Sequence, residues 1–337
     1  MTYKHKIRHW ISDGIGAAVQ LPPFSALAQR FFQKRSNIIF FHAIWRSDDE
    51  RLRYFGGVHL DEFAKEMKRL SRMFEFVSLA EVLNGAECST DQKPTICITF
   101  DDGFDLIDGG AAEVLEEYGA AATVFVNNDA YEYERLLWPH SFHFINADKG
   151  EQAFVNAFNE VQKLQNLGPA INSYSQYISV AKNWPQSRAN EIADQVWHAA
   201  GMANMDDVLA RFKPYMDAEK LKDWCARGHH VGSHCKSHFF SSGLEAANLD
   251  EQFYRPADAL NSLLGLSDLP LAYPFGDRLS PALENLVIDS NAFSCLLGTD
   301  RLSGRNEDPT KMDRIEVDLG LNRYFFGEPI IRALQGR

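Results

Sequence analysis

The sequence lacks the features of several protein classes. Its five cysteines are an odd number and never occur as CxxC, which excludes a disulfide framework and a thiolate zinc site. The formal charge of −12 leaves no broad basic surface, so nucleic acid is excluded as a partner. No segment is apolar over the thickness of a bilayer, and the N-terminus has no apolar run of signal-peptide type. We therefore expect a protein of a reducing compartment, the cytoplasm.

Residues 1–35 form a basic arm at the start of an acidic chain. The arm has one acidic residue, Asp13, and six basic ones: Lys4, Lys6, Arg8, Arg30, Lys34 and Arg35. Such a segment could make a peripheral contact with an anionic membrane at its inner face. A solvated or loosely docked terminus is the alternative.

From residue 36 onward, short apolar runs alternate with amphipathic helical stretches, as in chains built from βα units. The runs are IIFF (38–41), FEFV (74–77), TICITF (95–100), AATVFV (121–126), HHVG (229–232), LAY (271–273) and FSCLL (293–297). Between about residues 148 and 221 the strand signals stop and helical segments follow. This pattern predicts an α/β fold with a mainly parallel sheet, as one barrel over residues 36–337 that carries a helical insertion.

Two adjacent carboxylates, Asp101 and Asp102, follow the run TICITF. Successive side chains of a strand point to opposite faces, so a pair inside the strand would bury one charge in the core. If the strand ends at Phe100 and Gly103 turns the chain, both carboxylates can reach the space above the strand end. Active sites of α/β barrels form there.

Two imidazoles four residues apart, His234 and His238, follow the run HHVG. One turn brings both rings to one side, and two imidazoles with one carboxylate form a ligand set for a divalent metal such as zinc. The second aspartate could then handle protons on the attacking water. The spacing alone is a weak signal, since His5/His9 and His230/His234 share it, but the position after a strand favours His234 and His238.

Together, TFDDG (99–103) and HCKSH (234–238) resemble the first two motifs of the polysaccharide deacetylase family, also called the NodB-homology or carbohydrate esterase 4 group. The resemblance implies a distorted (β/α)7 barrel with Asp101 as general base. It also implies that Asp102, His234 and His238 bind one divalent metal ion. Zinc is the first candidate, and cobalt and nickel are alternatives.

The sequence YPFGD (273–277) resembles the third motif of this family, whose aromatic residue after proline donates its backbone N–H to the oxyanion. The resemblance implies this role for Phe275, and we expect Tyr273 beside it to contact substrate. The usual arginine of the motif would fall at Ala272 and is missing. Arg314 is a candidate replacement.

No histidine follows His238, although the general acid of the family usually lies in a C-terminal motif. His42, directly after the run IIFF, instead resembles the acid of the circularly permuted members, the exopolysaccharide deacetylases of biofilm systems. In the aromatic-rich segment after residue 126, we expect Trp138 to contact a sugar ring, and His140 and His143 to be structural.

The resemblance implies a metal-dependent hydrolase that removes the N-acetyl group of an amino sugar. The expected partner is an acetylated surface glycan or its lipid-linked precursor. One alternative is removal of a formyl group or an O-acetyl ester from a lipid-linked sugar. Another is a noncatalytic carbohydrate-binding barrel, because two of the family's usual residues are missing; the intact pairs Asp101/Asp102 and His234/His238 argue against it.

Overall fold

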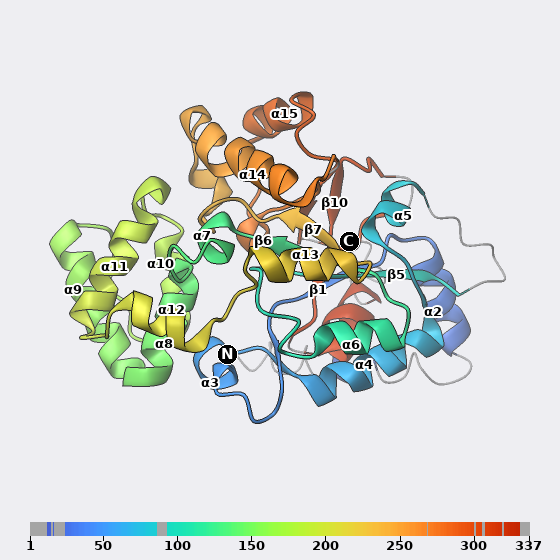
Figure 1. The fold of residues 1–337 in the computed structure, drawn as a ribbon, viewed down its shortest axis with the longest axis horizontal. Coiled ribbons are helices and arrows are strands. Elements are labelled where there is room, and N and C mark those ends of the chain that lie inside the picture. Colours follow the sequence, from blue (N-terminus) through green and yellow to red (C-terminus); the bar gives the residue numbers. More distant parts are fainter. Residues whose placement is uncertain are drawn as a thin grey trace.

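The structure, a computed structural model, describes residues 12–14, 16, 24–85, 93–267, 269–299, 301–304, 307–318 and 320–330. A parallel β-sheet lies at its centre, with helices around it (Figure 1). Within these ranges, no helix is both long enough and apolar enough to cross a membrane.

The main sheet has nine strands in the described chain, all paired in parallel, in the order β10-β9-β8-β7-β6-β5-β1-β11 with β4 beside the start of β5. The strands are β1 (Ile38–Phe41), β4 (Glu75–Phe76), β5 (Thr95–Phe100), β6 (Ala122–Val126), β7 (His230–Ser233), β8 (Leu271–Ala272), β9 (Leu296–Gly298), β10 (Lys311–Asp313) and β11 (Ile315–Glu316). A separate parallel pair is formed by β2 (Ile44–Trp45) and β3 (Val58–His59). Each of the seven predicted runs overlaps a strand of the main sheet, which confirms the mainly parallel sheet.

One extended segment, residues 311–316, joins the two ends of this sheet. Its first half, β10, pairs with β9, and its second half, β11, pairs with β1. Between them, Arg314 donates its backbone N–H to the carbonyl of Gly298 (3.0 Å). Counted as one, and with β4 left aside because it lies off this order and pairs only with β5, the segment gives the described chain seven strand positions, the number predicted for the barrel.

Side chains of β5 alternate between two buried surroundings. Ile98 and Phe100 pack among residues of the surrounding helices, whereas Cys97 packs with residues of β1, β6, β8 and β9 inside the barrel. Thr99 points to the same side as Cys97. By the same alternation, the side chain of Asp101, two residues further on, starts from that side as well. Because both faces are covered, the run TICITF is apolar or uncharged throughout. The carboxyl ends of β1, β5 and β7 lie at one edge of the sheet, where the site forms.

Helices cover the outside of the sheet, and their apolar stripes explain how they pack. In α4, for example, Phe63, Met67 and Leu70 recur at helical spacing and are buried. The helices are α2 (Phe24–Gln33), α3 (Arg51–Phe55), α4 (Leu60–Met73), α5 (Leu79–Leu83), α6 (Ala111–Glu117), α7 (Asn128–Tyr131), α8 (Trp138–Lys149), α9 (Glu151–Gln165), α10 (Tyr177–Ala181), α11 (Ala189–Ala199), α12 (Met205–Phe212), α13 (Ala218–Ala226), α14 (Arg255–Leu264) and α15 (Pro281–Asp289).

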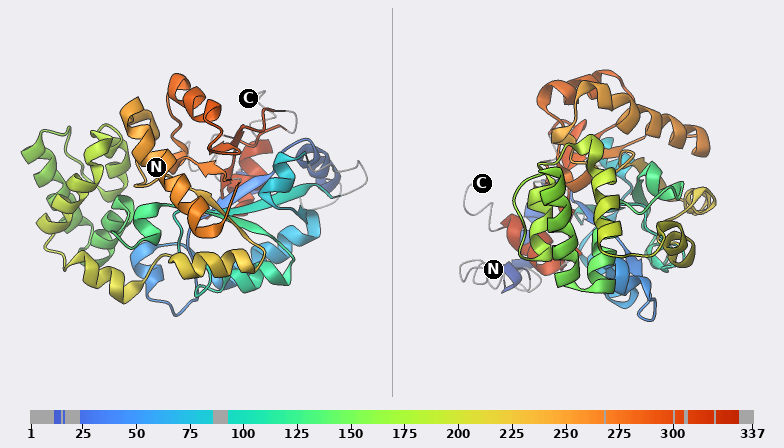
Figure 2. Two further views of the ribbon diagram at one scale, coloured as in Figure 1. Left: turned by 45° about the horizontal axis from the view of Figure 1, so that its top comes forward. Right: turned by 90° about the vertical axis from the view of Figure 1, so that its left-hand side faces the viewer.

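Helices α8 to α12 gather at one end of the molecule, between β6 and β7 in the chain (Figures 1 and 2). In the structure this helical group runs from Trp138 to Phe212. It begins and ends earlier in the chain than the insertion expected at about residues 148–221. The chain then returns to the sheet, where Tyr215 forms an antiparallel bridge with Phe104. The next helix, α13, packs on the barrel, since the ring of Trp224 lies 6.3 Å from that of Phe100.

Of the predicted basic arm, residues 1–11, 15 and 17–23 lie outside the described residues. Helix α2 lies within the arm, and its Phe32 is buried against Phe74 and Phe325, with ring centroids 5.4 and 4.9 Å away. The end of the arm is therefore part of the core. Its contact with an anionic membrane stays a prediction.

Candidate metal centre and active site

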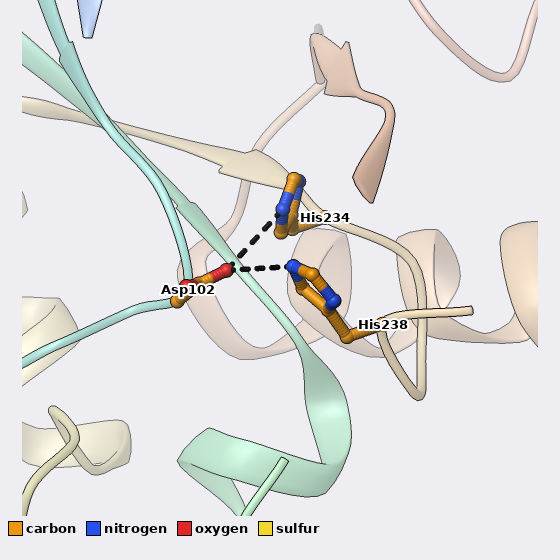
Figure 3. A group of neighbouring side chains, drawn as sticks. All are labelled: Asp102, His234 and His238. Atoms are coloured by element: carbon orange, nitrogen blue, oxygen red, sulfur yellow. Dashed lines mark ion pairs between the residues drawn. The ribbon is translucent and has the colours of Figure 1, made fainter. Parts of the chain in front are cut away.

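Asp102, His234 and His238 converge at the carboxyl ends of β5 and β7 (Figure 3). Asp102 Oδ1 lies 3.4 Å from His234 Nε2 and 3.1 Å from His238 Nε2. All three side chains are buried. The structure thus brings together the three residues for which the sequence predicted a shared metal ion.

The hydrogen bonds around His234 show that this group suits a cation. His234 Nδ1 lies 2.8 Å from the carbonyl of Ala272, so Nδ1 carries the proton and the lone pair of Nε2 faces Asp102. A carboxylate oxygen and an imidazole lone pair are both acceptors, so they do not attract each other directly, but a cation between them can bind both. Asp102 Oδ1 is buried and has no hydrogen-bond partner among the described residues. The three residues therefore fit a divalent metal ion with nitrogen and oxygen ligands.

The charge states of these residues favour the same use. Burial would raise the pKa of Asp102, but His238, His140 and His234 lower it well below its usual value. Burial lowers the pKa of His238. The carboxylate is therefore ionised and His238 is neutral at physiological pH, which are the forms that bind metals.

The backbone around the site adopts conformations that are rare for residues with side chains. Of the eight non-glycine residues with positive φ in the described chain, half belong to the three motifs: Asp102 (φ 69°), Cys235 (φ 64°), His238 (φ 54°) and Phe275 (φ 58°). Left-handed conformations outside glycine cost free energy and tend to occur at functional sites. Because the chain turns at Asp102 and Gly103 (φ 69°), the adjacent carboxylates of Asp101 and Asp102 can face the same space.

Asp101 is held by Arg314, the residue between β10 and β11. Two guanidinium nitrogens of Arg314 donate to the two carboxylate oxygens of Asp101 at 2.7 and 2.8 Å, and one also donates to Thr99 Oγ1 at 3.0 Å. Arg314 has no exposed surface. Burial would raise the pKa of Asp101, but the charge of Arg314 lowers it. Arg314, the candidate replacement for the arginine missing from the third motif, therefore contacts Asp101.

Removing Arg314 should destabilise the fold. We expect Arg314→Met to lower the free energy of unfolding by about 3–5 kcal/mol, because it leaves the carboxylate of Asp101 buried and unpaired. The double variant Arg314→Met/Asp101→Asn removes both charges and should recover part of this loss. Urea unfolding of the metal-free proteins measures both values. Equal stability of the single variant and the wild type, or no recovery in the double variant, would contradict the pairing.

His42 lies beside the aspartates, at the end of the neighbouring strand β1. Phe41 pairs with Phe100 in the sheet, and the N–H of Asp101 donates to the carbonyl of Phe41 (2.9 Å). Asp318 accepts from both the backbone N–H (3.2 Å) and the ring Nδ1 (2.6 Å) of His42. Burial would lower the pKa of His42, but Asp318 raises it well above its usual value. The imidazole therefore stays protonated to a higher pH than an ordinary histidine.

Phe275 lies next to His238 in the short turn Pro274–Gly276. Its ring stacks on Phe240 with centroids 4.1 Å apart and meets the ring of His238 edge-on at 4.4 Å. A methyl group at Gly276 (φ 66°) would lie 1.9 Å from Thr299 Oγ1, so this turn accepts only glycine there. The motif thus places the ring of Phe275 beside His238.

Trp138 and Tyr273 do not offer the surfaces that we expected for substrate. Trp138 has no exposed surface, and its indole N–H donates to the carbonyl of His238 (2.8 Å). Its ring packs against other aromatic side chains, including Tyr177 and Phe275. Tyr273 is also fully buried in the core. The helical group covers Trp138, so its visible role is to hold the loop of His238 in place.

Three residues at the site were not assigned a functional role from the sequence. His140 Nε2 lies 3.0 Å from Asp102 Oδ2, and His140 Nδ1 lies 2.7 Å from the hydroxyl of Tyr215. The third is Asp318, the partner of His42. Asp318 follows the two-residue strand β11, and recognising that strand would have made it a candidate, as Asp101 was after β5.

Comparison with known proteins relates the chain to one family. A family model described as polysaccharide deacetylase matches residues 89–287, which is more than half of the chain. The match contains Asp101, Asp102, His234 and His238, whereas His42 and Arg314 lie outside it. A search of curated proteins found no match.

Solved structures share the fold. The Streptococcus pyogenes deacetylase PplD in complex with acetate has a TM-score of 0.54 and 14% identity, covering 88% of this chain and 97% of that chain. A polysaccharide deacetylase from Bacillus cereus has a TM-score of 0.51 and 13% identity, covering 89% and 69%. IcaB from Ammonifex degensii has a TM-score of 0.50 and 17% identity, covering 84% and 92%. These similarities confirm the predicted fold class.

Proposed function

Because the chain belongs to the polysaccharide deacetylase family, we propose that it is a metal-dependent hydrolase that removes the N-acetyl group from an amino sugar in an acetylated glycan. The observation that carries the proposal is the convergence of two buried acceptors, Asp102 Oδ1 and His234 Nε2, in a geometry that suits a cation between them. Asp101 and His42, both at strand ends beside this place, supply the proton transfers that amide hydrolysis needs.

Asp102, His234 and His238 would hold the metal, with zinc first and cobalt or nickel as alternatives. When bound, the metal acts as a Lewis acid that makes water more acidic and polarises the substrate carbonyl. Metals of this kind accept the nitrogen and oxygen ligands present here.

The chain's own residues would then move the protons. Asp101, kept ionised by Arg314, accepts a proton from the water that attacks the acetamide carbonyl carbon. The backbone N–H of Phe275 would donate to the oxygen on which negative charge develops. As the C–N bond breaks, His42 gives its proton to the leaving amine, and the products are acetate and the free amino sugar.

Asp318 would set which nitrogen of His42 acts. Since Nδ1 is bound to the carboxylate of Asp318, Nε2 is the atom that can give a proton to the substrate. The same contact keeps the imidazole protonated while the reaction proceeds.

This role predicts a change in pH dependence when Asp318 is replaced. A general acid works only while protonated, so activity falls as the pH rises through its pKa. Asp318→Asn removes the largest cause that raises the pKa of His42, while Asp102 and Asp101 still raise it. The alkaline limb of the kcat/KM profile should therefore move to lower pH. Glu316→Gln, which alters the other carboxylate grouped with His42 and Asp318, is the control and should shift the limb less. An unmoved limb in Asp318→Asn would exclude the pair as the acid.

The substrate class is tested by incubating the full chain with acetylated amino-sugar oligomers, cell-envelope glycans and lipid-linked sugars. Mass spectrometry should detect loss of acetyl groups from an N-acetylated glycan, with release of acetate. Release of formate, or loss of ester-linked acetyl alone, would favour the alternative reactions on a lipid-linked sugar. No change in any sample would favour a carbohydrate-binding protein.

A further inference from the structure

The helical group between β6 and β7 contacts the side chain of Asp102 through His140. His140 lies in the first turn of α8, and its Nε2 is 3.0 Å from Asp102 Oδ2, the oxygen that does not face His234 and His238. His140, like Asp102, is buried. The two oxygens of Asp102 thus have separate neighbours: one faces the metal site and the other faces the helical group.

The hydrogen bonds of Tyr215 determine which nitrogen of His140 carries the proton. The Tyr215 hydroxyl accepts the backbone N–H of Leu137 (3.1 Å) and lies 2.7 Å from His140 Nδ1. Its own proton is therefore available for Nδ1, which leaves the ring proton on Nε2. An ionised carboxylate can only accept, so this tautomer is also the one that Asp102 requires. The chain runs from Tyr215 through His140 to Asp102, with each group donating to the next.

Packing holds this chain of groups in place. The ring of His140 packs against those of Phe104 and Tyr215, with centroids 4.6 and 5.7 Å away. The segment of Tyr215 is bonded to the loop that carries Asp102: the N–H of Met216 donates to the carbonyl of Gly103 (2.9 Å), and Phe104 and Tyr215 form a bridge. The imidazole therefore has little freedom to rotate away from Asp102.

We propose that His140, oriented by Tyr215, is a positioning residue that makes Asp102 a ligand through one oxygen only. The Nε2–H bond occupies Oδ2 and fixes the rotation of the carboxylate, so that Oδ1 points to the space shared with His234 and His238. Groups that orient metal ligands in this way typically contribute 10- to 100-fold to metal affinity. The helical group is then part of the metal centre. This inference rests on the metal site of the proposed function.

The test compares zinc affinity in four full-length variants, measured by competition with a chromogenic chelator. His140→Phe keeps the packing but cannot donate, and we expect its zinc dissociation constant to rise about 10- to 100-fold. His140→Gln has an amide N–H that can reach Asp102, so it should recover part of the affinity. Tyr215→Phe should weaken zinc binding by less than His140→Phe. His143→Phe, the matched change three residues along α8, should bind zinc as the wild type does.

A second readout reports on the ligands themselves. In the cobalt-loaded protein, the visible absorption bands should shift in His140→Phe as the carboxylate turns, and return towards the wild type in His140→Gln. Thermal unfolding of each variant shows whether it is folded. Should His140→Phe not fold, His140→Gln and Tyr215→Phe decide the question.

Wild-type zinc affinity in folded His140→Phe, or in Tyr215→Phe together with His140→Gln, would overturn the proposal. Equal loss in His140→Gln and His140→Phe would also overturn it, because it would make His140 a ligand in its own right. A wild type that binds zinc but leaves every glycan acetylated contradicts the proposed function alone. A wild type that binds neither zinc nor cobalt contradicts both.

Discussion

Asp101→Asn should lose most of its turnover while it still binds zinc. Asparagine has nearly the same size and can accept one hydrogen bond from Arg314, but it cannot take a proton from the attacking water. General-base catalysis is typically worth a factor of about 10² to 10⁴, and kcat should fall by this much. Asp101 is not among the three residues of the ligand group, Asp102, His234 and His238, so the metal site should persist.

The measurement for Asp101→Asn combines kcat on an acetylated oligomer with zinc content by atomic absorption. Asp108→Asn is the matched control, because Asp108 lies on the same loop, is largely exposed and pairs with Lys220 away from the ligands. It should keep wild-type turnover and zinc content. Full activity in Asp101→Asn would mean that another group removes the proton.

Asp102→Asn should fail in a different way. Replacing a charged ligand by a neutral amide weakens the hold on a divalent cation, so activity should fall together with the amount of bound zinc. Excess zinc should restore part of the activity in Asp102→Asn and none in Asp101→Asn. The two adjacent substitutions thus differ in their response to added zinc: activity is partly restored in one and unchanged in the other.

A zinc titration of both variants, followed by bound zinc and acetate release, measures this difference. The wild type titrated alongside shows where excess zinc begins to inhibit. Equal loss of zinc in the two variants would mean that both aspartates bind the metal. Zinc rescue of Asp101→Asn instead of Asp102→Asn would mean that their roles are reversed.

The parts of the site that could be predicted from the sequence follow strands with strong signals. The run TICITF is apolar or uncharged along its length because both of its faces are buried, so the carboxylates after it stand out. His42 likewise follows a buried run, and His234 follows a run that is buried except for His230. Once the strands are parallel neighbours, their carboxyl ends must lie at one edge, and the residues after them must meet.

Other parts depend on elements too short to leave a pattern. Arg314 and Asp318 lie at strands of two or three residues, where alternation cannot be recognised. Arg314 became a candidate only because the family's arginine was missing at Ala272. Its two hydrogen bonds to Asp101 depend on the way residues 311–316 join both edges of the sheet, which no local signal encodes.

The helical group explains the remaining differences. An aromatic-rich segment can be a sugar platform or a core, and the sequence does not say which. Trp138 is buried because α8 to α12 pack around it, and this packing is a tertiary property. The same packing brings His140 to Asp102, although the two residues are 38 positions apart. Its place in the first turn of a helix gave no sign of that contact.

The most direct test of the account is to strip the wild-type chain of metal and titrate it with zinc, while bound zinc and acetate release from an N-acetylated oligomer are measured in the same samples. The account predicts no acetate release without metal, and release that rises in proportion to bound zinc until the site of Asp102, His234 and His238 is filled. Full acetate release from the metal-free chain would contradict it.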